Sequence, residues 1–496
     1  MMLIIEVLYL ITVGLMALYG FNSLFYTWFY RRTRGSASAQ KMQTPTGALG
    51  DDLPFITVQL PIYNERYVAA RLINAVAALD WPNDRLQIQV LDDSSDDTGL
   101  IVASTLANLR EGGMRIEHLR RPERSGYKAG ALEFGLESAQ GEFVAIFDAD
   151  FMPQADFLHQ TIPSFADPTV GCVQTRWGHV NRDYSRLTQA QALGIDGHFL
   201  IEQNVRNRIG AFLNFNGTAG VWRRASMDDA GGWQGDTLTE DLDLSYRAQL
   251  RSWRIAYLPD VVVAAELPVE VDALKRQQFR WAKGSLQTAR KLLGSVWRAP
   301  EPLWRKVLAT LHLTNYAVHP LMVLNLLFLL PITSSHSPLL YITPFLTLAA
   351  IGPPAMYWTA MQTRGQSIGT RIGRLLILMT IGVGLSLNNS KAALEAFTGV
   401  ESEFKRTPKF AVGSEQSAWQ GSSYALPRDP TVWGELLLAI YAALLLAYCM
   451  FAGIWWVYLW VGLYLVGYSY LSYSAFHQAW QKRSTRSRGV GVPSES

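Results

Sequence analysis

The sequence has little charge and no long basic run. Charged residues make up 17% of the 496 residues, well below the roughly 25% of soluble chains, although the length would allow about three domains of about 150 residues each. This deficit excludes an ordinary soluble enzyme. The 44 basic and 41 acidic residues nearly balance, and no run of lysines and arginines has the length of a nucleic-acid-binding arm, which excludes nucleic acid as a partner.

Cysteine is almost absent as well. The chain has only Cys172, in its polar middle, and Cys449, inside an apolar run. Two cysteines so placed exclude a disulfide framework and a cysteine-based metal site. We therefore expect the polar part of the chain to lie in a reducing cytosol.

An apolar segment opens the chain. Residues 3–29 carry one charge, Glu6, and three arginines follow at once, a pattern that predicts a spanning helix whose C-terminal end is cytosolic. A cleaved signal peptide is the alternative, but it would have basic residues before its apolar core and a small-residue cleavage site after it. We expect residues 1–31 to be a transmembrane anchor.

Four further apolar runs follow the polar middle, at residues 307–332, 339–361, 372–387 and 433–473. The last is long enough for two crossings of about 20 residues each. The connection 331–340 has no lysine or arginine, whereas basic residues precede residue 372 and fill the tail after residue 481. All basic clusters stay on the cytosolic side only if the short run 372–387 lies flat in the interface. We therefore expect five spans in a plasma or inner membrane, with the N-terminus outside and the C-terminus inside.

Between residues 55 and 295 short apolar runs alternate with helical stretches. Strands are predicted at residues 55–63, 86–94, 114–119 and 142–150, and helices at 66–79 and 130–138. This β–α–β repetition predicts an α/β fold with a mainly parallel sheet, and in such sheets ligands bind beyond the carboxyl ends of the strands. The predicted organisation is an anchor (1–31), a catalytic domain (52–300), two membrane helices (301–362), an interfacial helix with a loop (363–431), two membrane helices (432–475) and a cytosolic tail (476–496).

Acidic residues follow two of the predicted strands. Asp92, Asp93 and Asp96 come after one, and Asp148 and Asp150 after another. A turn with an aspartate helix cap explains the first cluster as well as a binding site does. The second leaves two carboxylates at one strand end, which suits a hard divalent cation that bridges diphosphate oxygens. No glycine-rich phosphate loop of the Walker or GxGxxG type occurs, so phosphates would be held in another way.

Five motifs share the catalytic region in a fixed order: LDDS (91–94), KAGAL (128–132), DAD (148–150), TED (239–241) and QQFRW (277–281). The series resembles the D, DxD, TED and QxxRW motifs of family 2 glycosyltransferases of the processive, cellulose-synthase-like kind. FNGTAGVWRR (215–224) and TEDLDLSYRA (239–248) are similar to the mannan and glucomannan synthase branch and its bacterial relatives. The resemblance implies a GT-A catalytic domain, Rossmann-like and mainly parallel, joined to an α-helical transmembrane region.

The resemblance also implies a role for each motif. Asp148 and Asp150 would bind Mg2+ or Mn2+, which neutralises the diphosphate leaving group. Asp241 would take the proton of the acceptor hydroxyl, and one base with direct displacement implies inversion at the anomeric carbon. The other implied donor-binding residues are Asp92, Asp93, Lys128 and Arg280, and the implied acceptor-binding residues are Asn216, Gly217, Glu240, Gln277 and Trp281.

Two segments have a plain structural alternative. Residues 271–293 form an amphipathic pattern, so the arginine and tryptophan of QQFRW fit an interfacial helix as well as a sugar platform. FKRTPK (404–409) resembles the F-x-V-T gating loop of processive synthases, with an arginine in place of the usual valine, but an ordinary cytosolic connection is the alternative. The loop residues so implied are Phe404, Arg406, Thr407 and Lys409.

The expected function is synthesis of a β-linked mannan, glucomannan or glucan, coupled to export of the growing polysaccharide across the lipid bilayer. The motifs do not separate UDP-glucose from GDP-mannose as the donor. Transfer of one sugar to a membrane lipid, such as ceramide or diacylglycerol, is the first alternative, and a transporter or scaffold with a degenerate catalytic domain is the second. Polar residues on one apolar run would line an export path or serve helix packing: His312, Asn315, Tyr316, His319 and Asn325. The short tail predicts no cyclic-dinucleotide control module, so an accessory export or regulatory partner would supply control.

Overall fold

A seven-stranded sheet forms the centre of the polar region. The computed structural model describes residues 2–35, 52–340, 348–402, 406–412, 424 and 426–487, and its sheet has the order β3-β2-β1-β4-β6-β5-β7. β6 runs antiparallel to both of its neighbours, and the other adjacent strands are parallel. The predicted α/β fold with a mainly parallel sheet is confirmed. The strands are β1 (Ile56–Ile62), β2 (Leu86–Asp92), β3 (Ile116–Leu119), β4 (Phe143–Ile146), β5 (Val170–His179), β6 (Gly220–Arg223) and β7 (Arg254–Ala265).

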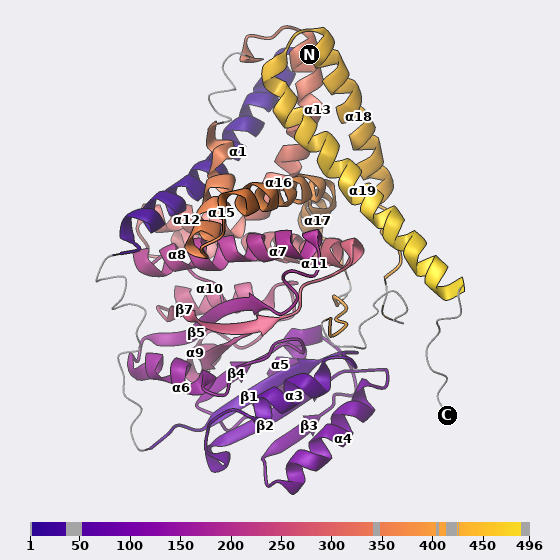
Figure 1. The fold of residues 1–496 in the computed structure, drawn as a ribbon. Helices are drawn as coiled ribbons and strands as arrows, with labels where there is room; N and C mark the ends of the chain where they lie inside the picture. Colours follow the sequence, from indigo (N-terminus) through magenta and orange to yellow (C-terminus); the bar gives the residue numbers. More distant parts are fainter. Residues whose placement is uncertain are drawn as a thin grey trace.

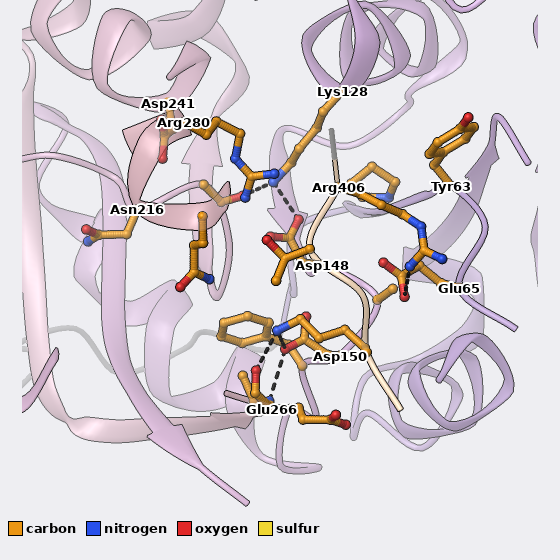
Figure 2. Close-up of a pocket in the computed structure, with 18 of the residues that line it drawn as sticks. Tyr63, Glu65, Lys128, Asp148, Asp150, Asn216, Asp241, Glu266, Arg280 and Arg406 are labelled. Carbon is orange, nitrogen blue, oxygen red and sulfur yellow. Dashed lines mark hydrogen bonds and ion pairs between the residues drawn. The ribbon is translucent and has the colours of Figure 1, made fainter. Parts of the chain in front are cut away.

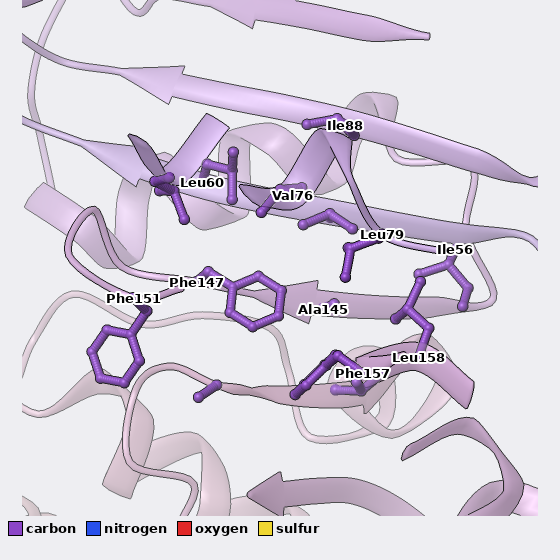
Figure 3. Close-up of a cluster of buried hydrophobic side chains, with 14 of the residues drawn as sticks. Ile56, Leu60, Val76, Leu79, Ile88, Ala145, Phe147, Phe151, Phe157 and Leu158 are labelled. Atoms are coloured by element: carbon purple, nitrogen blue, oxygen red, sulfur yellow. The ribbon is translucent and has the colours of Figure 1, made fainter. Parts of the chain in front are cut away.

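Helices cover both faces of this sheet. β1 and β2 are buried at nearly every position, as expected of parallel strands that are covered on both sides. One apolar cluster joins β1, β2 and β4 to α3, α4 and α6, and Figure 3 shows its aliphatic and phenylalanine side chains. A second cluster joins the other face to α5, α9 and α10. The helices are α3 (Ala69–Ala77), α4 (Thr98–Glu111), α5 (Tyr127–Ser138), α6 (Phe157–Thr161), α9 (Arg224–Asp229) and α10 (Glu240–Leu250).

A layer of helices separates the sheet from the apolar ends of the chain (Figure 1). α7 (Arg186–Asp196) continues through a π-helical segment (Gly197–Gln203) into α8 (Asn204–Ile209). α11 (Val271–Arg298) includes the predicted amphipathic segment and buries its apolar side against α10, α12 (Leu303–Leu313) and α17 (Ser386–Thr398). The QxxRW motif therefore lies on a helix that contacts the catalytic domain on one side and the apolar region on the other.

Above this layer stand α1 (Met2–Thr33), α13 (Val318–Ser334), α18 (Val432–Phe451) and α19 (Tyr458–Ser487), with α15 (Gly352–Thr363) beside α1 (Figure 1). Three helices within the described residues are long and apolar enough to span a membrane, namely Met2–Thr33, Asn315–Ser334 and Val432–Phe451. α16 (Ile368–Gly384) and α17 meet at 42° and would add a fourth span if they formed one bent helix.

The predicted count of five spans remains a prediction. The expected span at 339–361 includes residues 341–347, which lie outside the described residues. α16 lies crosswise between the catalytic domain and the long helices in Figure 1, and it packs on α7 and α19. That course suits the interfacial helix predicted from the charge pattern.

Candidate active site

A cavity of about 190 Å³ lies beyond the carboxyl ends of β1, β2 and β4. It brings together residues from all five motifs and from the loop after α17, although these are far apart in the sequence. Asp92 does not line it: this carboxylate is buried, and it accepts hydrogen bonds from the Ser94 amide (2.9 Å) and the His118 ring (2.9 Å). Phe404 lies outside the described residues. The predicted residues that line the cavity are Asp93, Lys128, Asp148, Asp150, Asn216, Gly217, Glu240, Asp241, Gln277, Arg280, Trp281, Arg406, Thr407 and Lys409.

Asp93 borders one end of the cavity, directly after β2. Arg121 donates two hydrogen bonds to its carboxylate, at 2.5 and 3.1 Å, and the pair is almost fully buried. Nearby, the Arg124 guanidinium lies 3.4 Å from the centre of the Tyr63 ring. Sequence reasoning missed Arg121, Arg124 and Tyr63. The position of Tyr63 directly after the end of β1 was the one local signal for it.

Lys128, in the first turn of α5, joins three motifs. Its ammonium donates to Asp148 Oδ1 at 2.5 Å and to the Gly217 carbonyl at 2.8 Å, and it lies 4.0 Å from Glu240. Burial lowers the pKa of Lys128, but Asp148 and Glu240 outweigh this and raise the pKa overall, so the side chain is a fixed positive charge. Figure 2 shows it pointing into the site beside Arg280.

Gly217 has a backbone conformation that favours glycine. Its backbone φ is +80°, and a Cβ there would meet Asp241 Oδ2 at 3.0 Å and Lys128 Nζ at 3.4 Å. The turn that carries Asn216 and Gly217 therefore passes directly beside both charged groups. A side chain at this position would separate the lysine from the carboxylate.

Asp148 and Asp150 follow β4, and each is paired with an ammonium group. Asp150 Oδ2 accepts from Lys409 Nζ at 2.7 Å and from the Glu266 amide at 3.0 Å. Among the described residues, no hydrogen bond reaches the other oxygen of either aspartate. Two carboxylates with free oxygens at a strand end fit a hard divalent cation. No group of three or more acidic, histidine or cysteine side chains that could enclose a metal is found among the described residues, so further ligands would come from substrate oxygens and water.

Asp241 and Glu240 begin α10, with both side chains at the cavity. The Leu242 amide donates to Asp241 Oδ1 at 2.8 Å. Burial, with the charge of Glu240 as the second cause, raises the pKa of Asp241 to about 7, although Lys128 opposes this. Burial also raises the pKa of Glu240. A carboxyl group with a pKa near neutrality suits general base catalysis, because it is available without a proton and still holds one firmly.

The loop after α17 covers the cavity. Lys409 donates to the Glu266 carbonyl at 2.5 Å as well as to Asp150, and the Glu266 carboxylate accepts from the Phe410 and Val412 amides at 2.9 and 3.3 Å. Sequence reasoning missed Glu266, whose pKa is raised by burial. No local signal marks it, because the groups that donate to its carboxylate and carbonyl lie more than 140 residues further along the chain.

Arg406, where the family pattern has valine, fixes the other end of this loop. Its guanidinium lies 3.2 Å from Glu65 and 4.0 Å from the centre of the Tyr424 ring. Burial raises the pKa of Glu65 to about 8, and Arg406 opposes the increase. Glu65 is a further cavity residue that the sequence did not single out.

Comparison with known proteins identifies the family. The family model described as "Glycosyltransferase like family 2" matches residues 54–284. Glucomannan 4-beta-mannosyltransferase 2 of Arabidopsis thaliana is 36% identical over 396 residues, which cover 77% of this chain and 72% of that protein. The chain belongs to glycosyltransferase family 2. The predicted family and its glucomannan synthase-like branch are confirmed, and the chain is an enzyme of the glycosyltransferase class.

Two other comparisons bear on this glycosyltransferase. Glucomannan 4-beta-mannosyltransferase 1 of Oryza sativa subsp. japonica is 43% identical over 260 residues, so the match spans about half of each chain, 51% of this one and 50% of the relative. A solved mannosyltransferase from Pyrobaculum calidifontis, in complex with GDP-Man and Mn2+, is 21% identical with a TM-score of 0.50, covering 79% of this chain and 100% of that chain. This second likeness concerns the fold, which is of the GT-A type.

A second cavity of the glycosyltransferase, of about 420 Å³, begins where the first one ends. Asn216, Asp241, Gln277 and Trp281 line both. The second cavity extends along the helical layer toward the long apolar helices, and a third, apolar cavity of about 220 Å³ lies among those helices. Of the residues considered for an export path, His312, Asn315, Tyr316 and His319 line the second cavity, and Asn325 lines the third.

Proposed function

We propose that this glycosyltransferase polymerises a β-linked polysaccharide, a mannan, glucomannan or glucan, and delivers the growing chain into the membrane. The observation that carries the proposal is the second cavity, which begins at Asp241 and Trp281 and continues past Tyr316 and His319 on the membrane side. A lining of aromatic rings and polar side chains suits carbohydrate, because sugar CH faces stack on rings while hydroxyl groups need hydrogen-bond partners.

Asp241 is the proposed base. It would accept the proton of the acceptor hydroxyl while that oxygen attacks the anomeric carbon from the side opposite the diphosphate. A single displacement inverts the configuration, so an α-linked donor gives a β-linked product. Trp281, which lines the cavity beside Asp241, would hold the terminal acceptor sugar by stacking.

Positive charge near Asp241 would receive the diphosphate. Lys128 and Arg280 line the same cavity, and fixed charges placed where negative charge develops stabilise the departure of the leaving group. Asp148 and Asp150 would hold a divalent cation, Mg2+ or Mn2+, which supplies further charge neutralisation when bound. Because Lys409 is bonded to Asp150, the loop and the cation would compete for that carboxylate.

The donor is proposed from the relatives. They are named as mannosyltransferases, which favours GDP-mannose over UDP-glucose here. Asp93, Tyr63 and Arg124, at the far end of the cavity from Asp241, would form the nucleoside end of the donor site, and the loop at 406–412 would cover it. The helices that could span a membrane, whether three, four or the predicted five, would anchor the catalytic domain so that synthesis takes place at the cytosolic surface.

Purified protein in lipid vesicles tests this function. It would be incubated with Mg2+ or Mn2+ and with radiolabelled GDP-mannose or UDP-glucose in separate reactions, and the product would be sized and digested with linkage-specific hydrolases. Material of high molecular weight from one donor is the expected result and names the sugar. A product with a single sugar on a lipid would replace this proposal by the lipid glycosyltransferase alternative.

A further inference from the structure

The wall of the second cavity contains a polar pair that none of the catalytic motifs includes. His198 and Glu202 lie in the π-helical segment between α7 and α8, and both line the cavity. π-helical turns are rare and occur frequently at functional sites. Gly197, which opens the segment, has no room for a side chain, because a Cβ there would meet the Tyr357 ring at 2.6 Å. The segment is therefore pressed against α15 on the membrane side of the cavity.

Hydrogen bonds hold the His198 ring from both sides. Its Nδ1 lies 3.2 Å from Glu202 Oε2, and its Nε2 lies 3.1 Å from Asn216 Oδ1. Asn214 Nδ2 also donates to Asn216 Oδ1, at 2.8 Å, which fixes that oxygen toward the ring. Both ring nitrogens therefore face oxygen atoms of neighbouring side chains, and these contacts fix the orientation of the ring.

Glu202 is itself held from behind. Arg206, which is fully buried, donates from Nε to Glu202 Oε1 at 3.0 Å. Burial opposes ionisation of Glu202, but Arg206 and His198 outweigh it and lower the pKa of this carboxyl group overall. The His198 and Glu202 side chains keep 27% and 18% of their surface exposed. The pair is thus supported by hydrogen bonds, partly exposed, and placed in the wall of the second cavity.

The cavity around His198 and Glu202 offers both kinds of contact that bind a sugar, aromatic stacking and hydrogen bonding. Trp281, Tyr316 and Tyr357 supply aromatic rings to the same cavity, and Asp241 stands at its catalytic end. A saccharide whose terminal hydroxyl reached Asp241 would extend along this wall, and its next hydroxyl groups would need both donors and acceptors. The Glu202 carboxylate has lone pairs beyond those that face Arg206 and His198, so it can accept from a hydroxyl group. An N–H of the His198 ring can be shared between its present oxygen partner and a saccharide hydroxyl group.

We infer that His198 and Glu202 form an acceptor subsite that binds hydroxyl groups of the saccharide chain behind its terminal sugar. The inference rests on the proposed function, since it assumes a saccharide acceptor in the second cavity. It adds a binding role for two residues outside the five motifs of the chain. His198 is an acceptor-binding residue here, and Arg206 is a positioning residue that acts through Glu202.

Direct binding separates this inference from the proposed function. The full-length protein in lipid nanodiscs would be titrated with β-1,4-linked mannotetraose and cellotetraose, and separately with the donor nucleotide sugar, for the wild type, His198→Ala and Glu202→Gln. We expect each variant to weaken tetrasaccharide binding about ten- to a hundredfold, the effect of losing charge-assisted hydrogen bonds, while donor binding changes less than about twofold. His159→Ala is the matched control, because His159 lies on α6 and lines none of the three cavities.

Each result of this experiment decides one of the two questions. Unchanged tetrasaccharide binding in His198→Ala, or no binding of either tetrasaccharide to the wild type, would overturn the subsite even if the protein made polymer. Equal losses of donor and tetrasaccharide affinity would also overturn it, because they indicate that His198 only supports the turn at Asn216. Selective loss of tetrasaccharide binding supports the subsite even if neither nucleotide sugar is polymerised, an outcome that would count against the proposed function alone.

Discussion

The strongest test of the site is the titration of Asp241. Its pKa is raised to about 7 by burial and by the neighbouring Glu240, and a general base works only without its proton. The acid side of the pH profile of kcat/KM, which reports the free enzyme, should therefore fall with a midpoint near pH 7. At pH 5.5 roughly 3% of the base would be ionised against half at pH 7, a loss of roughly 16-fold.

Substitution of the same residue gives the magnitude of its contribution. Asp241→Asn keeps the shape of the side chain and should lower the transfer rate by roughly 10²- to 10⁴-fold, or about 3–5.5 kcal/mol of activation free energy. Donor binding should remain, because Asp148 and Asp150 are intact. Asp236→Asn is the control, since Asp236 is an exposed carboxylate shortly before α10.

The assay follows labelled sugar incorporation and donor binding for both variants between pH 5.5 and 8. A flat wild-type profile over this range, or an Asp241→Asn variant with normal turnover, would refute the assignment of Asp241 as the base.

The raised pKa of Asp241 also affects the stability of the folded protein. The folded-state pKa lies above the unfolded value of 3.8, so the favourable contribution of this proton is present at low pH and is lost as the pH rises through about 7. Above pH 7, Asp241→Asn should unfold at a higher temperature than the wild type.

Three further perturbations follow from the contacts. Asp150→Asn should raise the cation concentration needed for half-maximal rate by at least roughly tenfold, measured in Mg2+ and Mn2+ titrations; an unchanged requirement would count against the site. Arg406→Val removes the contact with Glu65 and should raise the donor KM by roughly fivefold, about 1 kcal/mol, with little effect on kcat. Lys275→Met leaves Glu435 buried without the lysine Nζ that lies 2.7 Å from its carboxylate in the wild type. This should lower the free energy of unfolding by roughly 3–5 kcal/mol, measured by thermal unfolding. Lys275→Met/Glu435→Leu should recover most of that loss, and no recovery would contradict this reading.

The first half of the sheet was predictable and the second half was not. β1 to β4 are apolar runs with helices between them, so local pattern locates them to within four residues at each end. β5, β6 and β7 were not predicted. β6 spans four residues and pairs antiparallel with β4 and β5, an arrangement that only long-range pairing decides.

The residues of the site can likewise be divided into those that the sequence predicts and those that it does not. Residues in motifs, such as Lys128 and Asp241, carry a recognisable neighbourhood in the sequence. Glu65 and Glu266 gain their place in the site from partners far away in the chain, 341 residues away for Glu65 and Arg406 and 144 residues away for Glu266 and Phe410. An isolated glutamate in a sequence does not show whether it will be buried against an arginine, and so no local rule could have found these residues.

α11 joins the catalytic domain to the apolar helices through two ion pairs. Lys275 and Lys283 flank the QxxRW motif on this helix. Lys275 forms a fully buried ion pair with Glu435 of α18, and Lys283 lies 2.8 Å from Glu395 of α17. Buried ion pairs contribute little net stability compared with apolar packing, but their strict geometry specifies register. Because the two pairs fix α11 before and after Trp281, this proposed sugar platform keeps a constant position relative to both Asp241 and the helices that line the second cavity. A growing saccharide chain would therefore always pass from Asp241 into the same second cavity.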